Sequence, residues 1–413
     1  MAAGGTRRDA ATRKDELRIG TPVWMKSPRI SAAAAAELPA GPWDAVVVGA
    51  GISGALTAEA LTAAGLRVLI LDRRAPVRGS TPASTAMIQH EIDLPLIRLI
   101  RQSGRERAER AWRRSARAVD DLVALTARLG IDCGMERKQA LYLAGDAMGG
   151  RGLKAEAAAR RRAGLGAEFL NARDLAARFG IDRTGAIVSQ PSASANPAQL
   201  TAGLLAVARG RGAAIAAPVE VSDMAELPGG VALATRDGRV LTAGHAVFCT
   251  GYEFLPQMRS ASHRVTSTWA LASRPRIARP DWLDGFLVWE ASEPYLYFRS
   301  TPDGRIIAGG EDEDSPERNS DPRLLARKAA AIAAKLEAVA GIRIGRPAYA
   351  WAAPFSATSD GLPIIDRVPG CERVFAVMGF GGNGITFSMV AAQIVAAAIA
   401  GRPDPDAGLF AFR

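Results

Sequence analysis

The amino-acid sequence predicts an α/β protein in which a domain on a parallel sheet is interleaved with a second domain on a largely antiparallel sheet. Three observations support this fold class. Short apolar runs at 46–48 and 68–71 flank a glycine-rich turn and a helix. Strand-forming and aromatic residues are concentrated between 265 and 310. The length of 413 residues also exceeds that of one ordinary domain.

The first predicted unit is strand, helix, strand. The run 46–48 is typical of a strand buried in a parallel sheet, and it leads directly into GAGISG at Gly49–Gly54. The first glycine allows a tight turn, the second lets the backbone approach a pyrophosphate, and the third allows close helix packing. The second strand ends at Asp72, 18 residues after Gly54, where a carboxylate can accept hydrogen bonds from ribose hydroxyls. This Rossmann-type unit predicts a dinucleotide site but does not separate NAD from FAD.

The remaining elements follow in chain order. We expect a charged, helical middle region at about 100–190, a helix at Ala198–Arg211, a strand hairpin with its turn at Asp237-Gly238, and a helix at about 322–339. The expected domains are an N-terminal arm at 1–39, a cofactor domain from 40–98, 193–255 and 345–413, and a substrate domain from 99–192 and 256–344.

Composition narrows the protein class. Hydrophobic residues make up 48% and charged residues 23%, the balance of a soluble globular protein. The longest apolar run, Ile385–Gly401, is rich in alanine and carries Gln393, so we expect a buried helix and no membrane span. No apolar segment follows the basic residues near the N-terminus, which argues against a secretory signal and for a cytoplasmic protein. The 3 cysteines are widely spaced, which predicts neither a metal site nor a redox dithiol.

The net charge of +10 has two interpretations. Many arginines lie between Arg101 and Arg128, where apolar residues recur at helical spacing and the arginines occupy the other face. A solvated helix face is the simpler interpretation; an anionic partner such as RNA or a membrane surface is the alternative. Aromatic residues are not interleaved with the arginines, so nucleic-acid binding is not favoured.

Four blocks of sequence separate FAD from NAD. They are the GAGISG motif, GSTPASTAMIQHEID at Gly79–Asp93, VFCTGYE at Val247–Glu253, and TSDGLPIID with MGFGGNGITFS between Thr358 and Ser388. In this order they resemble the D-amino-acid-oxidase superfamily of flavoproteins, which includes glycine oxidase, sarcosine oxidase and D-amino-acid dehydrogenases. The resemblance covers almost all of the chain from about residue 42.

The resemblance implies an FAD site made by all four blocks. The second block packs on the pyrophosphate and the flavin ring, and the helix near Ile385 directs its N-terminus toward the part of the flavin where negative charge develops on reduction. With the motif residues, the expected FAD contacts are Gly49, Gly51, Ile52, Ser53, Gly54, Asp72, Arg73, Arg74, Ser80, Thr81, Ser84, Thr85, Ala86, Met87, Val219, Thr250, Gly251, Gly381, Gly382, Asn383, Gly384, Ile385 and Thr386.

Two positions depart from the family pattern. Sarcosine oxidase relatives attach the flavin through a cysteine at the position of Ala353 here, so the resemblance implies non-covalent FAD. Glycine and D-amino-acid oxidases grip the substrate carboxylate with an arginine at the position of Phe355 here. The usual carboxylate clamp is therefore absent, which puts a simple α-amino acid substrate in doubt.

The resemblance implies oxidation of a C–N bond in an amine or a secondary or D-amino acid to an imine, with hydride passing to flavin N5. The expected substrate pocket is Tyr295, Tyr297, Arg299, Trp351 and Phe355, with Arg299 either a displaced clamp or an exposed strand residue. Glu311–Asp314 follow the end of a predicted strand; they either form a solvated loop, which we favour, or attract a cationic amine. We expect a side chain from Gln89–Glu91 to reach the flavin ring.

Two other functions remain open. One is an RNA-modifying flavoprotein of the same superfamily, suggested by the basic charge. The other is an FAD-binding subunit of a larger dehydrogenase. In the preferred interpretation the partners are a small-molecule amine or amino acid and an electron acceptor, either O2 or a redox partner.

Overall fold

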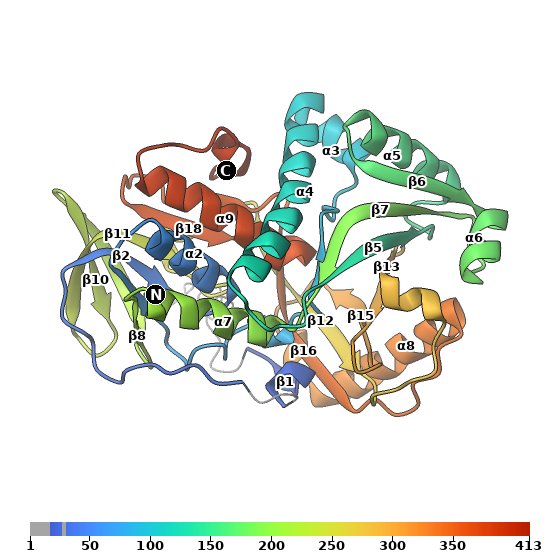
Figure 1. Cartoon of the computed structure of the whole chain (residues 1–413), viewed down its shortest axis with the longest axis horizontal. Helices are drawn as coiled ribbons and strands as arrows, with labels where there is room; N and C mark the ends of the chain where they lie inside the picture. Colours follow the sequence, from blue (N-terminus) through green and yellow to red (C-terminus); the bar gives the residue numbers. More distant parts are fainter. Residues whose placement is uncertain (1–16, 27–29) are drawn as a thin grey trace, which may run out of the picture.

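The computed structural model describes residues 17–26 and 30–413. The described chain forms two sheets that lie side by side, each with helices packed against it (Figure 1). The fold is mixed α/β, as the sequence predicts.

The first sheet is parallel at its centre and carries the glycine-rich turn. Its order is β17-β18-β11-β2-β3-β8, and only the β17–β18 pair in this path is antiparallel. Helices α2, α7 and α9 cover one face through the core that contains Val47, Leu56 and Val390 (Figure 1). The strands and helices are β2 (Trp43–Val48), β3 (Val68–Leu71), β8 (Ala214–Ala216), β11 (Val240–Phe248), β17 (Ile364–Arg367), β18 (Val374–Met378), α2 (Ile52–Ala63), α7 (Pro197–Gly210) and α9 (Gly384–Ile399).

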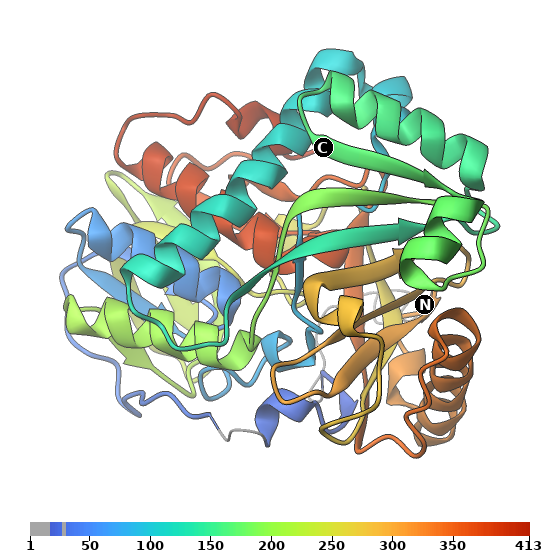
Figure 2. The ribbon, with the colours of Figure 1, turned by 45° about the vertical axis from the view of Figure 1, so that its right-hand side comes forward.

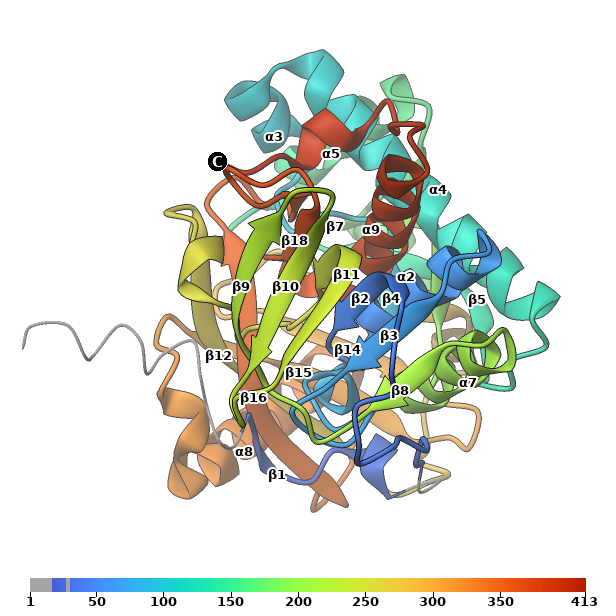
Figure 3. The same ribbon diagram turned by 90° about the vertical axis from the view of Figure 1, so that its left-hand side faces the viewer.

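A two-stranded hairpin extends this sheet and covers its other face. Strand β9 (Val221–Leu227) pairs with β10 (Gly230–Thr235), which pairs with β11 (Figure 3). Val231 and Leu233 of β10 share a core with Val46 and Leu69 of the central strands. The parallel strands are therefore buried on both faces, which explains their continuous apolar runs.

The second sheet is largely antiparallel and lies beside the first (Figure 2). Its order is β1-β16-β12-β15-β14-β13-β5-β7-β4, with β6 paired to β7 and a parallel pair between β13 and β5. Helix α8 (Pro322–Ala340) packs on it, with Ile332 and Leu336 in a core with Trp269 and Phe298. The strands are β1 (Ile19–Gly20), β4 (Met87–Gln89), β5 (Glu136–Leu143), β6 (Gly166–Asn171), β7 (Gly185–Ser194), β12 (His263–Ala272), β13 (Phe286–Glu290), β14 (Leu296–Ser300), β15 (Ile306–Glu313) and β16 (Tyr349–Thr358).

The middle region differs from the prediction of a helical segment. Helices α3 (Leu96–Ser103), α4 (Arg105–Arg128), α5 (Gly150–Arg162) and α6 (Ala172–Phe179) are present, but β5, β6 and β7 lie among them. The frequent charged residues favoured a helical interpretation, whereas the C-terminal half of β5 is fully buried in the sheet. Tertiary pairing overrides local composition here.

The arginines of α4 hold the C-terminal segment. Arg110 and Arg114 pair with Asp406 and Asp404, with both N–O distances at 2.9 Å, and Arg107 donates to the carbonyl of Leu409. Much of the basic face therefore has intramolecular partners. This supports the structural interpretation of the arginine-rich helix over an RNA surface.

The predicted arm falls partly on residues 1–16 and 27–29, which lie outside the described residues. The described part of 1–39 packs on the protein: β1 pairs with β16, and Trp24, 6% exposed, donates from Nε1 to the carbonyl of Ser84. The helical stretch Gly381–Ile399, which includes α9, is long and apolar enough to cross a membrane by length and composition, yet 61% of its apolar window is buried inside the protein. It serves as a core helix of the first sheet.

Candidate active site

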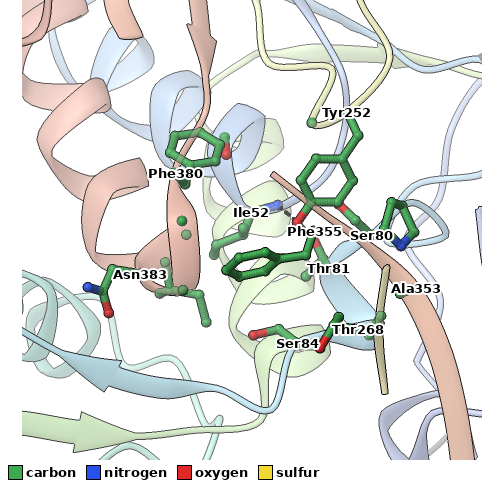
Figure 4. Close-up of a pocket in the computed structure, with 18 of the residues that line it drawn as sticks. Ile52, Ser80, Thr81, Ser84, Tyr252, Thr268, Ala353, Phe355, Phe380 and Asn383 are labelled. Carbon is green, nitrogen blue, oxygen red and sulfur yellow. Dashed lines mark hydrogen bonds between the residues drawn. The ribbon is translucent and has the colours of Figure 1, made fainter. Parts of the chain in front are cut away.

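A cavity of about 560 Å³ is lined by residues of both sheets. The ends of β2 and β11 and the start of α2 form one part of its wall, and strands β13, β14 and β16 form another. Figure 4 shows Ile52, Phe355 and Phe380 around the same space, with Ser80, Thr81, Tyr252 and Asn383 on its walls.

The glycine-rich turn forms the first part of the wall. Gly49 has a φ of +112°, and a Cβ there would lie 2.3 Å from the carbonyl oxygen of Cys249. A Cβ on Gly54 would lie 1.8 Å from the carbonyl oxygen of Gly49, so α2 can approach β2 only without one. The turn therefore places the N-terminus of α2, with backbone N–H groups that lack intrahelical acceptors, at the cavity.

Asp72 lies at the end of β3 beside this turn. Its Oδ2 accepts a hydrogen bond from the N–H of Ala50 at 2.7 Å, and its Oδ1 accepts one from Arg74 N at 2.8 Å. Burial raises the pKa of Asp72, although both backbone bonds oppose the shift. Arg73 and Arg74 both pair with Glu253 of the third block. These residues and Val219 form a polar end of the cavity that suits an adenosine ribose.

The second and fourth sequence blocks are joined by hydrogen bonds. Thr386 donates from its hydroxyl to the carbonyl of Gln89 at 2.9 Å, and the Asn383 amide donates to the carbonyl of Glu91. Thr81 Oγ1 accepts from the N–H of Ile52 at 2.9 Å (Figure 4). The start of α9 is thus held against the loop that also contacts the start of α2. Such a double helix-terminus site fits a dinucleotide whose second half is a flavin.

Aromatic residues line the other end of the cavity. Tyr295, Tyr297 and Phe355 lie on its wall, and Trp289 stacks on Tyr142 with ring centroids 3.8 Å apart. Burial raises the pKa of Tyr295 and Tyr297 well above the usual phenol range, so both hydroxyls remain protonated at neutral pH.

Two carboxylates also lie at this end, and Asp93 was not expected from the sequence. Asp93 lines the cavity and accepts from the N–H of Gly382 at 2.7 Å; Asp312 lines it as well and accepts from the Tyr295 hydroxyl at 2.7 Å. Desolvation raises the pKa of both, that of Asp93 to about 6 although this residue is exposed to solvent, and the charge of Asp312 contributes to the Asp93 shift. The position of Asp93 at the end of a matched block could have suggested it. Asp312 belongs to the acidic run for which attraction of a cationic amine was the alternative expectation.

The prediction of a solvated loop at Glu311–Asp314 was wrong. Strand β15 continues to Glu313, and Glu311, 8% exposed, pairs with Lys328 and Lys335 of α8. Lysines on a helix distant in sequence stabilise this acidic run, and periodicity within the run does not reveal them.

The structure also corrects Arg299 and Trp351. Arg299 is 1% exposed and donates to the carbonyls of Thr85, Ser300 and Ala195, so it is neither a carboxylate clamp nor an exposed strand residue. Trp351 is 1% exposed and donates from Nε1 to the carbonyl of Ala83 at 2.9 Å. Neither side chain lines the cavity; both hold the backbone of the loop that does. Tyr297 of β14 lines the cavity, whereas Arg299, two residues further along the same strand, lies in the core.

The other expected residues divide as follows. Gly54, Ala86 and Thr386 lie off the cavity surface, and Gln89 lines it whereas His90 and Glu91 do not. The expected residues that line the cavity are Gly49, Gly51, Ile52, Ser53, Asp72, Arg73, Arg74, Ser80, Thr81, Ser84, Thr85, Met87, Val219, Thr250, Gly251, Gly381, Gly382, Asn383, Gly384, Ile385, Tyr295, Tyr297 and Phe355.

Known proteins share this sequence pattern and fold. A family model described as FAD dependent oxidoreductase matches residues 44–398. The chain is 22% identical over 370 residues to the probable oxidoreductase OrdL of Haemophilus influenzae, covering 87% of this chain and 83% of that protein. It is 26% identical over 400 residues to the tRNA 5-methylaminomethyl-2-thiouridine biosynthesis bifunctional protein MnmC of Cupriavidus necator, covering 87% of this chain and 58% of that protein.

Among solved structures, glycine oxidase from Geobacillus kaustophilus superposes with a TM-score of 0.74 at 20% identity, covering 91% of this chain and 99% of that chain. This likeness concerns the fold. Because the family model spans most of the sequence and the cavity fits a flavin dinucleotide, the chain belongs to the family of FAD dependent oxidoreductases.

Proposed function

We propose that this protein oxidises a C–N bond of a small amine to an imine, with FAD held non-covalently. The observation that carries the proposal is Phe355, which lies on the cavity wall. By the sequence resemblance, it stands at the position where amino-acid oxidases of the superfamily hold a substrate carboxylate with an arginine. An isolated carboxylate resists transfer to such an apolar wall, whereas a neutral amine does not.

The residues of the first part of the cavity would hold the dinucleotide. The N-terminus of α2 would receive the pyrophosphate, Asp72 the ribose, and the start of α9 the flavin. When bound, FAD would accept the hydride that leaves the substrate carbon, and this hydride carries both electrons of the oxidation. The substrate nitrogen loses a proton in the same oxidation, and water then hydrolyses the imine to a carbonyl compound and an amine. O2 or a redox partner removes the electrons afterwards.

The chain's own residues favour the neutral amine. Tyr297 and Phe355 give the cavity an aromatic wall, and desolvation there lowers the pKa of a bound ammonium. The tyrosine hydroxyls, held protonated by burial, can donate or accept hydrogen bonds but cannot act as phenolate bases at neutral pH. No protein group needs to remove a proton from an amine that binds in its neutral form.

Two observations support non-covalent attachment. Ala353 has no nucleophile, and it lines the cavity at the position where relatives carry the attaching cysteine. Cys249 also lines the cavity, but burial raises the pKa of its thiol to about 12, so almost no thiolate forms at neutral pH.

The test is anaerobic mixing of the FAD-loaded protein with amines and amino acids while flavin absorbance is recorded. Primary or secondary amines should bleach the flavin faster than glycine, sarcosine or D-alanine at equal concentration. Faster reduction by the small amino acids would contradict the proposal.

A further inference from the structure

The substrate end of the cavity carries more negative than positive charge. Asp93 presents its carboxylate to the cavity, and no hydrogen bond within the described chain engages its Oδ1. Asp312 lies near enough to raise the pKa of Asp93 by its charge, and both charges raise the pKa of Tyr295. Both carboxylates therefore line the cavity, and no arginine or lysine among the described residues forms an ion pair with either.

The buried polar atoms that lack a hydrogen-bond partner on the cavity wall are acceptors. Gln89 Oε1, on a residue only 7% exposed, is buried without a hydrogen-bond partner among the described residues. Asp312 Oδ1 is also buried without a well-formed hydrogen bond among them, although the Thr268 hydroxyl lies close enough to lower the pKa of this carboxyl. A buried acceptor without a donor costs free energy, and two neighbouring carboxylates add repulsion. Positive charge on a ligand would relieve the repulsion between the carboxylates, and N–H donors on it would satisfy the buried acceptors.

The cations near the cavity are already engaged. Among the described residues that line it, Arg73 and Arg74 pair with Glu253 at the ribose end, and Arg98 donates to the carbonyl of Ala147 at 3.1 Å. The charge of Lys328 acts on Asp312, but its ammonium pairs with Glu311 and Glu313. Neither Asp93 nor Asp312 therefore has an ion-pair partner among the described residues.

We propose that Asp93 and Asp312 form a subsite for a second positive charge on the substrate. The preferred substrate is then a diamine, or an amine with a distal guanidinium. This inference rests on the proposed function and specifies its substrate class. The reacting nitrogen lies neutral against the aromatic wall, and the distal cation pairs with the two aspartates. A distal carboxylate is repelled by the same pair.

Three amines of equal chain length test whether the cavity prefers a distal positive charge. They are 1,4-diaminobutane, butylamine and 4-aminobutanoate, whose distal groups are cationic, apolar and anionic. The dependence of anaerobic flavin reduction on amine concentration gives an apparent Kd for each. We expect the diamine to bind about tenfold or more tightly than butylamine, and 4-aminobutanoate to bind most weakly.

Substitutions test whether the two aspartates cause the preference for the diamine. Asp93→Asn and Asp312→Asn should each remove most of the diamine preference, whereas Asp281→Asn, at an exposed position outside the cavity, should retain it. Calorimetry with tetramethylammonium, which has no lone pair and cannot form an imine, provides a readout independent of turnover. Its binding should weaken in the two cavity variants alone.

The outcomes separate the two proposals. If no amine reduces the flavin but tetramethylammonium binds in an aspartate-dependent way, the proposed function fails and the cation subsite stands. If amines reduce the flavin but 4-aminobutanoate binds as well as the diamine, the subsite is wrong. Loss of the reduction rate in Asp312→Asn with an unchanged preference would also overturn it, because the pair would then act on the reacting nitrogen. If the variants fold poorly, the order of the apparent Kd values of the three amines in the unsubstituted protein tests the subsite.

Discussion

Arg160 of α5 and Glu91 form an ion pair in which both side chains are completely buried. Glu156 pairs with the same guanidinium at 2.8 Å, and the ring of Trp112 lies 4.6 Å from it. Glu91 also accepts a hydrogen bond from Trp289 Nε1 at 2.9 Å. The ion pair thus supports an aromatic side chain of the cavity wall, and through Glu91 it anchors the loop that leads to Asp93.

Removal of this cation should destabilise the protein strongly. Arg160→Met leaves two buried carboxylates without a counter-charge, for which we expect a loss of about 3–5 kcal/mol in the free energy of unfolding. Urea denaturation of the apoprotein measures it. The control is Arg343→Met, which breaks an exposed pair with Glu337 and should cost less than about 1 kcal/mol. Equal losses in the two variants would show that the buried network does not stabilise the fold.

The sequence predicted the parallel sheet and the dinucleotide end of the cavity because their determinants are local. The turn at Gly49–Gly54, the strands on either side and the acid at Asp72 lie within one short segment, and each has a specific backbone requirement. Helix α7 could be found in the same way, since Asn196 caps it and Pro197 occupies its first position.

The substrate end could not be predicted to the same degree because its determinants lie far apart in the chain. Whether Arg299 faces a ligand or a carbonyl depends on where Thr85 and Ala195 lie, and neither is near it in sequence. Asp312 belongs to an acidic run that reads as solvated until Lys328 and Lys335 are placed beside Glu311. Each of these predictions was wrong because it depended on tertiary contacts that the local sequence does not reveal.

The flavin should leave the polypeptide without bond cleavage. Acid or heat precipitation should release all FAD into the supernatant, because Ala353 has no nucleophile and the Cys249 thiol has a pKa raised to about 12. Flavin absorbance in the supernatant and in the washed pellet is compared. Flavin that remains in the pellet after washing in denaturant would contradict non-covalent attachment.

Asp72 should contribute to FAD affinity. If its carboxylate receives the ribose, Asp72→Ala should weaken FAD binding by about 1–3 kcal/mol, the cost of a charge-assisted hydrogen bond. Titration of apoprotein with FAD, followed by fluorescence quenching, gives the dissociation constant. Asp44→Ala removes an acid at the start of β2 whose partner is the exposed Arg67, and it should leave FAD affinity unchanged. An unchanged affinity in Asp72→Ala would mean that the acid only holds the Ala50 and Arg74 amides.

Cation binding should depend on pH through Asp93. Desolvation raises the pKa of this carboxyl to about 6, although the residue is exposed to solvent, so the ligand-free protein is progressively protonated there as the pH falls through that value. A cation binds the deprotonated form, and tetramethylammonium has no titratable group of its own. Its affinity should therefore be constant well above pH 6 and fall below it, with one proton released per cation bound in the acidic range.

The groups that face Asp93 set the size of this effect. The Gly382 N–H stabilises its charged form, whereas the charge of Asp312 opposes it, and the Tyr295 hydroxyl stays protonated throughout. Asp93→Asn should remove the inflection near pH 6 and leave only a weaker dependence from Asp312, whose pKa is also raised by burial. Calorimetric titrations between about pH 5 and about pH 8 measure both proteins, within the range where perturbed carboxyls titrate. A flat affinity in the unsubstituted protein, or the same inflection in Asp93→Asn, would show that Asp93 does not pair with the cation.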